Sequence, residues 1–255
     1  MDLPTLNVLA FAINMAASYA CGQGYFGKDI PEVSGEHPTL VTPAGYAFSI
    51  WGIIFSSETA FVAWQATFGR KSAIVTKGVG PWFAIACVLQ ALWTIAFTQE
   101  YIALSAGLLI GIAMSLGIAL VGLAPFKTDM FTILWGPEGW LVHFPIGLHA
   151  GWTCAAALVN VNMLIESEPL SSKVGALIVT VVVACVAAAL AAVEYAAPVY
   201  LGAIAWALAG IVNETELRDR SLPPDIAEGV NEALAGSCLV LIIIGILASL
   251  ALIAG

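Results

Sequence analysis

The stretch "HPTLVTPAGYAFSIWGIIF", His37 to Phe55, joins a polar, proline-marked entry to a long apolar run. Pro38 and Pro43 restrict the backbone before the run, and proline suits the start of a helix because its fixed φ is already helical. The run continues to about residue 68, and a membrane span needs roughly 20 mainly apolar residues. It carries Trp51 and a carboxylate, Glu58. The stretch therefore predicts a rigidly started membrane helix with an acid inside.

The composition places the whole chain in the same class. Hydrophobic residues make up 60% of the 255 residues and charged residues only 10%, whereas about a quarter of the residues in soluble domains are charged. Eight Lys and Arg against seventeen Asp and Glu leave a net charge of -9 and form no basic cluster, which excludes nucleic-acid binding. The five cysteines are scattered singly, so we interpret them as small buried hydrophobes.

Eight apolar stretches approach the length of a membrane span. Residues 197–213 form a short one that follows 174–193 after only a few residues, which favours a tight helical hairpin and leaves seven spans as the fallback. We predict an all-α, polytopic integral membrane bundle of about eight transmembrane helices, with the first retained rather than cleaved as a signal. The predicted spans are 4–22, 44–68, 81–99, 102–124, 139–164, 174–193, 197–213 and 233–254.

The two long connections are predicted to be surface loops. Residues 23–43 are rich in Gly and Pro, and residues 214–232 are polar, with a short helix broken at Pro223 and Pro224 as a further option. Cationic side chains usually gather on the cytoplasmic side, but eight spans divide them equally, so no orientation is predicted. A bacterial inner membrane and a plastid or thylakoid membrane both fit. One side receives Arg70, Lys71, Lys77 and Lys127, and the other receives Lys28, Lys173, Arg218 and Arg220.

Four of the predicted helices each carry a polar or indole-bearing stripe. Such groups face the interior of a bundle or a water-filled cavity, because leaving them in hydrocarbon is costly. Glu58 must either become protonated or find a donor, for which His149, Gln90 and the indoles of Trp93 and Trp152 are candidates by type. A structural hydrogen bond and a ligand-facing role for Glu58 both stay open. The stripes are Asn7, Asn14 and Ser18; Trp51, Glu58 and Gln65; Gln90 and Trp93; and His149, Trp152, Ala156 and Asn160.

The fourth predicted span carries a small residue at every fourth position. Small residues let membrane helices approach closely, so this stripe predicts either packing within the bundle or the seam of a homodimer. The stripe consists of Ala103, Gly107, Gly111, Ser115 and Ala119.

Motifs of catalysis and metal binding are absent from the sequence. It has no Gly-x-Ser-x-Gly elbow, no phosphate-binding glycine loop and no His-Glu-x-x-His. His143 and His149 are six residues apart and would point to different sides of one helix, so they cannot share a metal. The chain is therefore predicted not to be an enzyme.

Several of these segments together resemble a known family. The opening stretch, followed by "FVAWQ", "LQALWTIAFTQEYIALS" and "GLHAGWTCAAALVNVNML", is similar to the second to fifth helices of the translocator protein family, also called tryptophan-rich sensory or TspO-like proteins. The "TPAGYAFSIWG" core resembles its longer bacterial and algal variants. The resemblance covers about residues 1–165 and thins to "AIAWALAGI" beyond. It implies a five-helix TspO-like unit at 1–165 and about three additional transmembrane helices at 166–255.

The resemblance also implies a site. Members of the family form a five-helix bundle, often dimeric, whose pocket binds tetrapyrroles and hydrophobic ligands such as sterols and aromatic drugs. Pro43, Tyr46 and Trp51 match the start of its second helix, Trp93 a tryptophan of its third, and Trp152 and Asn160 a pair on its fifth. Three positions depart from the pattern: Gln90 stands for an asparagine, His149 for a tyrosine and Glu58 for an apolar residue.

Three functions are compared. The first is a non-enzymatic protein that binds a tetrapyrrole (porphyrin, haem or chlorophyll) or another hydrophobic ligand such as a carotenoid or lipid. The pocket would lie between the first, second, third and fifth helices, with Tyr46, Trp51, Glu58, Gln90, Trp93, His149, Trp152 and Asn160 as its site residues.

The second is an accessory pigment-binding or scaffolding subunit of a larger membrane complex, such as an algal photosystem supercomplex. His149, Gln90 and Glu58 would then be candidate magnesium ligands for chlorophyll. The third is a small-solute transporter, which the lack of an internal repeat disfavours. The expected partners are the lipid bilayer, a hydrophobic small molecule, and a second copy or other membrane proteins.

Overall fold

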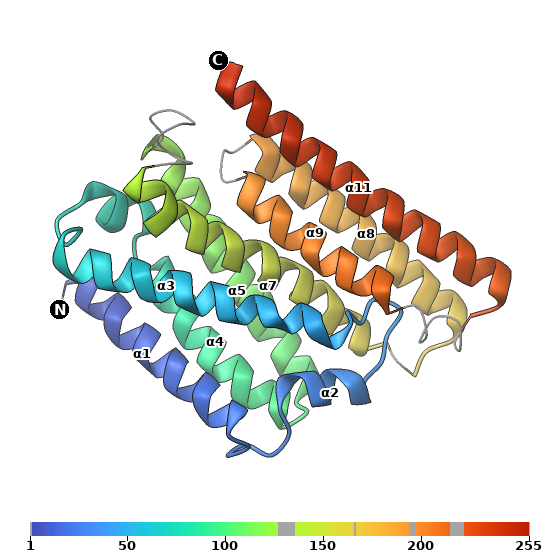
Figure 1. Ribbon diagram of the computed structural model, residues 1–255. Helices are drawn as coiled ribbons and strands as arrows, with labels where there is room; N and C mark the ends of the chain where they lie inside the picture. The colour runs from blue at the N-terminus through green and yellow to red at the C-terminus, as the bar shows by residue number, and fades with distance from the viewer. Residues whose placement is uncertain (1, 127–135, 166, 194–196, 215–221, 255) are drawn as a thin grey trace.

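The computed structural model describes residues 2–126, 136–165, 167–193, 197–214 and 222–254, and these form helices and connecting turns without a strand. The predicted all-α membrane bundle is confirmed (Figure 1). The elements are α1 (Leu3–Gly22), α2 (Ile30–Glu36), η1 (Gly45–Ser49), α3 (Ile50–Thr67), η2 (Ile74–Val79), α4 (Trp82–Thr98), α5 (Ile102–Leu123), η3 (Ala124–Phe126), η4 (Gly139–His143), α7 (Phe144–Met163), α8 (Leu170–Val193), α9 (Ala197–Asn213) and α11 (Pro224–Ala254).

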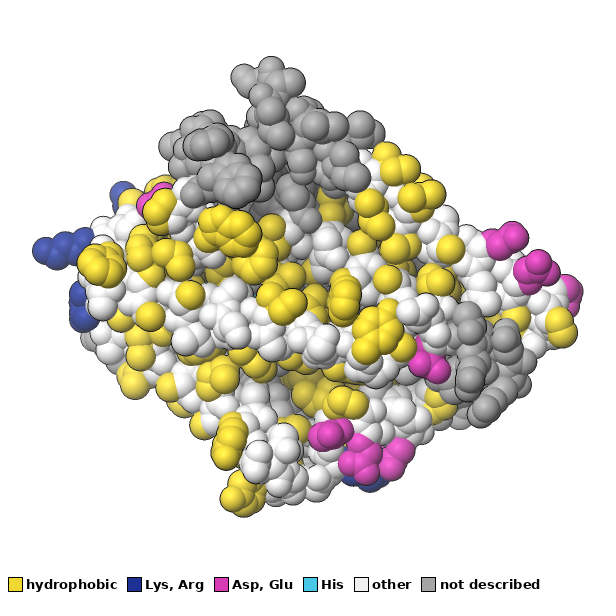
Figure 2. All heavy atoms as spheres, viewed as in Figure 1, with side chains coloured by type: hydrophobic (Ala, Val, Ile, Leu, Met, Phe, Trp, Pro, Cys, Tyr) yellow, Lys and Arg dark blue, Asp and Glu magenta, His cyan; other side chains and the backbone are white. Residues whose placement is uncertain are grey.

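Each of the eight predicted spans coincides with one of the long helices. Five apolar helical segments are long enough to cross a membrane, and α4, α8 and α9 supply shorter apolar stretches. Figure 2 shows hydrophobic side chains over the middle of the visible face and charged side chains toward its ends, as a bilayer requires. At one end Nη2 of Arg70 lies 2.9 Å from Oδ2 of Asp2, which joins the end of α3 to the start of α1.

Both predicted loops contain helix, which was expected only as an option in the second. In the first loop, α2 begins with a capping box in which Asp29 and Glu32 each bond the other's backbone N–H. In the second, α11 begins at Pro224, so residues 224–232 are helical. Lys127, Arg218 and Arg220, which entered the orientation argument, lie outside the described residues.

The helices pack as neighbours in a continuous series. α4 lies between α1 and α5, α5 packs against α7, and α7 packs against α9, which contacts α8 and α11 (Figure 1). A Cβ added to Gly151 of α7 would lie 2.4 Å from the Tyr200 carbonyl oxygen of α9, and one on Gly111 of α5 would lie 3.1 Å from Leu89 of α4. Glycine at these positions therefore sets how closely the helices approach.

The small-residue stripe of α5 is divided between the interior and the surface. Gly111 faces α4, and Ser115 and Ala119 are buried, so this half packs within the bundle. Ala103 and Gly107 are exposed. A homodimer seam along the exposed half stays a prediction.

The entry segment quoted at the outset is held in place by α9. The backbone N–H of Ala44 donates to the Gly210 carbonyl at 3.0 Å, and Nε1 of Trp206 donates to the Ala47 carbonyl at 2.9 Å. A Cβ on Gly210 would lie 2.8 Å from that of Ala47. The chain then makes a 3-10 turn, η1, before α3 begins. The rigid helix start that Pro43 predicts is therefore held in place by α9.

Candidate functional site

A mostly apolar pocket opens between the entry segment and the centre of the bundle. Small-molecule sites are usually concave and mostly apolar, as this one is. Its walls come from α2, η1, α3, α4, α5, α7 and α9. The lining residues are Ile30, Ser34, Pro43, Phe48, Trp51, Trp93, Phe97, Leu109, Trp152, Ala155, Ala156, Val159, Asn160, Met163, Ala207 and Ile211.

Three of the predicted tryptophans meet at this pocket. The ring centroid of Trp51 lies 6.0 Å from that of Trp93 and 6.2 Å from that of Trp152, which it meets edge to face. All three side chains are buried, and none of the three indole N–H groups has a hydrogen-bond partner among the described residues. Buried indoles usually find a partner. The tryptophans of the pocket wall therefore keep three buried N–H donors unpaired within the described ranges.

Asn160 also lines the pocket, but its amide is already engaged. Oδ1 accepts from the Ser105 hydroxyl of α5 at 2.7 Å, and Nδ2 donates to Sδ of Met163 at 3.4 Å. Ser34 of α2 is the other polar side chain in the lining, and its buried hydroxyl has no partner within the described part of the chain. Asn160 thus ties α7 to α5 and presents an ordered polar edge to the pocket.

Glu58 and His149 lie behind the tryptophans rather than in the lining. Nδ1 of His149 is 2.7 Å from Oε1 of Glu58, and both side chains are fully buried. The imidazole meets the ring of Trp51 edge to face, with centroids 5.7 Å apart. Of the donors that the sequence offered for Glu58, the structure places the histidine against it.

The two remaining predicted residues lie outside the lining as well. Gln90 is buried in α4, where its Oε1 has no partner among the residues described. Tyr46 is 45% exposed and packs against α9, its hydroxyl accepting from Asn213 Nδ2 at 3.1 Å and its ring meeting Trp206 edge to face. Tyr46 is therefore in position to anchor the entry segment to α9.

The walls of the pocket also differ from the four expected helices. α1 contributes no lining residue, and Nδ2 of Asn7 donates to Oε1 of Gln65 on α3 at 3.0 Å. In its place α9 supplies Ala207 and Ile211. These two residues stand four apart in the "AIAWALAGI" motif, a helical spacing that could have pointed to a shared face.

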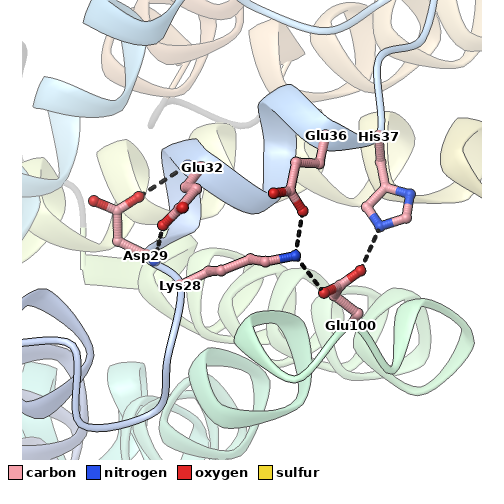
Figure 3. A network of polar contacts seen from close by, with 6 residues as sticks. All are labelled: Lys28, Asp29, Glu32, Glu36, His37 and Glu100. Atoms are coloured by element: carbon pink, nitrogen blue, oxygen red, sulfur yellow. Dashed lines mark hydrogen bonds and ion pairs between the residues drawn. The ribbon is translucent and has the colours of Figure 1, made fainter.

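The pocket is covered by α2, which a network of charged side chains holds over the turn between α4 and α5 (Figure 3). Lys28 bridges Glu36 and Glu100, with Nζ 2.7 Å from Oε1 of Glu100, while Nε2 of His37 lies 3.2 Å from the other oxygen of Glu100. The hydrogen bonds from Lys28 and His37 lower the pKa of Glu100. The hydrogen bonds that Lys28 donates to Glu100 and Glu36 raise the pKa of Lys28. The network joins the cover to the bundle where Ile30 and Ser34 reach the pocket.

Glu100 also holds an uncommon backbone conformation. Its φ is +60°, in the left-handed region that residues other than glycine rarely adopt. The backbone of this turn is therefore strained at the residue whose carboxylate contacts Lys28 and His37 beside α2. The role of Glu100 could not be predicted from the sequence, because it depends on contacts with Lys28 and His37, which lie far away in the chain.

Comparison with known proteins agrees with this architecture. A family model described as "TSPO-like protein" matches residues 4–253. The chain belongs to the TSPO-like protein family. The match extends through the C-terminal helices, beyond the region where sequence motifs alone carried the resemblance. No curated protein and no solved structure matches the chain significantly. The chain is thus a multi-pass membrane protein of the TspO class.

Proposed function

We propose that this TSPO-like protein is a non-enzymatic membrane protein that binds a tetrapyrrole or a comparable planar hydrophobic ligand in the tryptophan-lined pocket. The observation that carries the proposal is the meeting of Trp51, Trp93 and Trp152 at one apolar pocket with their indole N–H groups unpartnered among the described residues. Flat aromatic walls suit a planar macrocycle, and the donors suit its carboxyl or carbonyl oxygens.

Closure supports the same class of ligand. Ile30 and Ser34 of α2 line the pocket, so α2 covers it from one end of the bundle. A macrocycle would pack against the wall formed by Trp51 and Trp152 while its polar edge points toward Asn160 and the charged cover. A compact polar solute would leave the apolar lining without contact, which favours a hydrophobic ligand.

A binding titration with protoporphyrin tests the proposal. The purified protein in detergent should quench and shift the porphyrin spectrum saturably with one site per chain. Trp152→Ala and Trp51→Ala each remove a wall of the pocket, and losing one aromatic contact of about 1 to 2 kcal/mol predicts at least several-fold weaker binding.

Trp140→Ala is the matched control. Trp140 is half exposed, packs against Phe144 and is not a lining residue, so its loss should leave the affinity unchanged. Unaltered affinity in both pocket variants, or an equal loss in Trp140→Ala, would refute the pocket as the binding site.

Gentle isolation of the protein from its native membrane distinguishes the accessory-subunit alternative from the proposed function. An absorption spectrum and pigment extraction of the isolated chain should show bound tetrapyrrole if the pocket is used. Chlorophyll or carotenoid that appears only together with other subunits would favour the alternative.

A further inference from the structure

Glu58 and His149 form the one carboxylate–imidazole pair that is fully buried among the residues described. One atom of each side chain bonds the other, whereas Oε2 of Glu58 and Nε2 of His149 have no partner within the described ranges. A buried polar atom without a partner costs free energy. A pair that served only as a structural hydrogen bond would not be expected to keep one such atom on each side chain. The two remaining atoms are a proton acceptor and a ring nitrogen that can gain or lose a proton.

The pair has two charge states that differ by one proton. Without it, a carboxylate beside a neutral imidazole carries one net negative charge. With it, the pair is neutral overall, either as carboxylate and imidazolium or as carboxylic acid and imidazole. Because an uncompensated charge in an apolar interior is strongly disfavoured, the surroundings of the pair control how readily it takes up this proton.

Little else near the pair can compensate its charge. Helices α1, α3, α4, α5, α7 and α9 contain no lysine or arginine, so His149 is the one available cation. The other titratable side chains on these helices and on η1 and η4 are Tyr19 and Cys21 of α1, Tyr46 of η1, Cys87 of α4, His143 of η4, Cys154 of α7 and Tyr200 of α9. Cys87 lies within electrostatic range of Glu58, and Cys154 and Tyr200 contact each other.

We propose that Glu58 and His149 are a proton-binding pair coupled to occupancy of the tryptophan-lined pocket, so that the ligand binds together with a proton. This inference rests on the proposed function. The link is Trp51, which lines the pocket and whose ring meets His149 and Trp152 edge to face. A ligand that contacts Trp51 therefore touches a residue that also packs against His149 of the pair.

The direction of the coupling follows from charge. A hydrophobic ligand that fills the pocket makes the surroundings of the pair more apolar, which disfavours the state with net negative charge. Acceptor oxygens on the ligand, held by the indole donors, add negative potential on the same side. Both effects favour proton uptake. By linkage, the affinity should rise as the pH falls, by at most about tenfold per pH unit for one proton.

Isothermal calorimetry tests the coupling with free-base protoporphyrin dimethyl ester, whose esterified carboxyls cannot titrate. The titrations are made in two buffers of different ionisation enthalpy and repeated between about pH 6 and pH 9. The difference between the buffers gives the number of protons bound with the ligand. The wild-type protein should take up a measurable fraction of one proton. Glu58→Gln keeps the shape and a hydrogen bond to His149 but removes the carboxylate, so it should bind the ester without this uptake.

Glu228→Gln is the control, because it removes an exposed carboxylate of α11 that lies outside the pocket lining and its cover, and it leaves the buried pair intact. It should retain the proton uptake of the wild type. A wild-type proton count of zero with normal binding would overturn the coupling and leave the proposed function standing, and this result needs no variant to fold. An equal count in Glu58→Gln would overturn it too, whereas failure of the ester to bind at any pH would refute the proposed function together with the coupling.

Discussion

Substituting Gly151 by alanine should push α9 away from α7 and destabilise the protein. The added Cβ would lie 2.4 Å from the Tyr200 carbonyl oxygen and 2.8 Å from the Ala203 Cβ. That oxygen is about 1 Å closer than the 3.4 Å at which ordinary contact begins, and it belongs to the backbone of α9, so no side chain can rotate away. Overpacking of this kind costs about 1 to 3 kcal/mol.

Gly202→Ala supplies the control, because Gly202 also lies in α9 but has no atom within 4 Å of an added Cβ. Both variants gain the same helix propensity, at most about 1 kcal/mol, so the difference between them isolates the cost of the contact. Equilibrium unfolding in mixed detergent micelles, followed by circular dichroism, should place Gly151→Ala about 1 to 3 kcal/mol below Gly202→Ala. Free energies within about 0.5 kcal/mol of each other would refute the close α7–α9 crossing.

Two further predictions concern the polar contacts. The pKa of Glu100 is lowered from 4.5 and that of Lys28 is raised from 10.5, so the network on the pocket cover should stabilise it between these values and weaken as pH falls below about 4.5 or rises above about 10.5. Amide hydrogen exchange in α2, corrected for the intrinsic pH dependence of the exchange rate, should show lower protection at both extremes, and protection that does not change with pH would contradict the prediction. Asn7→Leu should lower the free energy of unfolding by about 1 kcal/mol, because it leaves Oε1 of Gln65 unpaired. Additive losses of unfolding free energy in a double-mutant cycle with Gln65→Leu would exclude the hydrogen bond.

The helices could be predicted from the sequence because their signal is local. An apolar run of sufficient length must become a helix in a bilayer, whatever lies beside it, since its backbone polar groups have no other partners. The helices within the two predicted loops also have local signals in the sequence. The capping box at Asp29 and Glu32 and the proline at 224 were readable, but the polar composition around them favoured a loop.

The site could be predicted only in part, because a pocket depends on which helix faces meet. Trp51, Trp93 and Trp152 were found from their spacing and from the family pattern, and all three line the pocket. Periodicity shows that side chains share a face but not which neighbour that face meets. For that reason Ala207 and Ile211 were missed.

The C-terminal helices contribute to the pocket and do more than surround it. The backbone N–H of Ala44 and the carbonyl of Ala47 would both lose their partners without α9, since Gly210 and Trp206 bind them. Ala44 precedes the turn that leads into Trp51 and Ala47 lies within it, and α9 also supplies Ala207 and Ile211 to the pocket wall. Unpaired backbone groups beside a membrane are costly, so the entry segment would not keep this conformation alone. The stiff proline start therefore positions Trp51 only because α9 packs against it, and the pocket of this protein is a property of the N-terminal and C-terminal helices together.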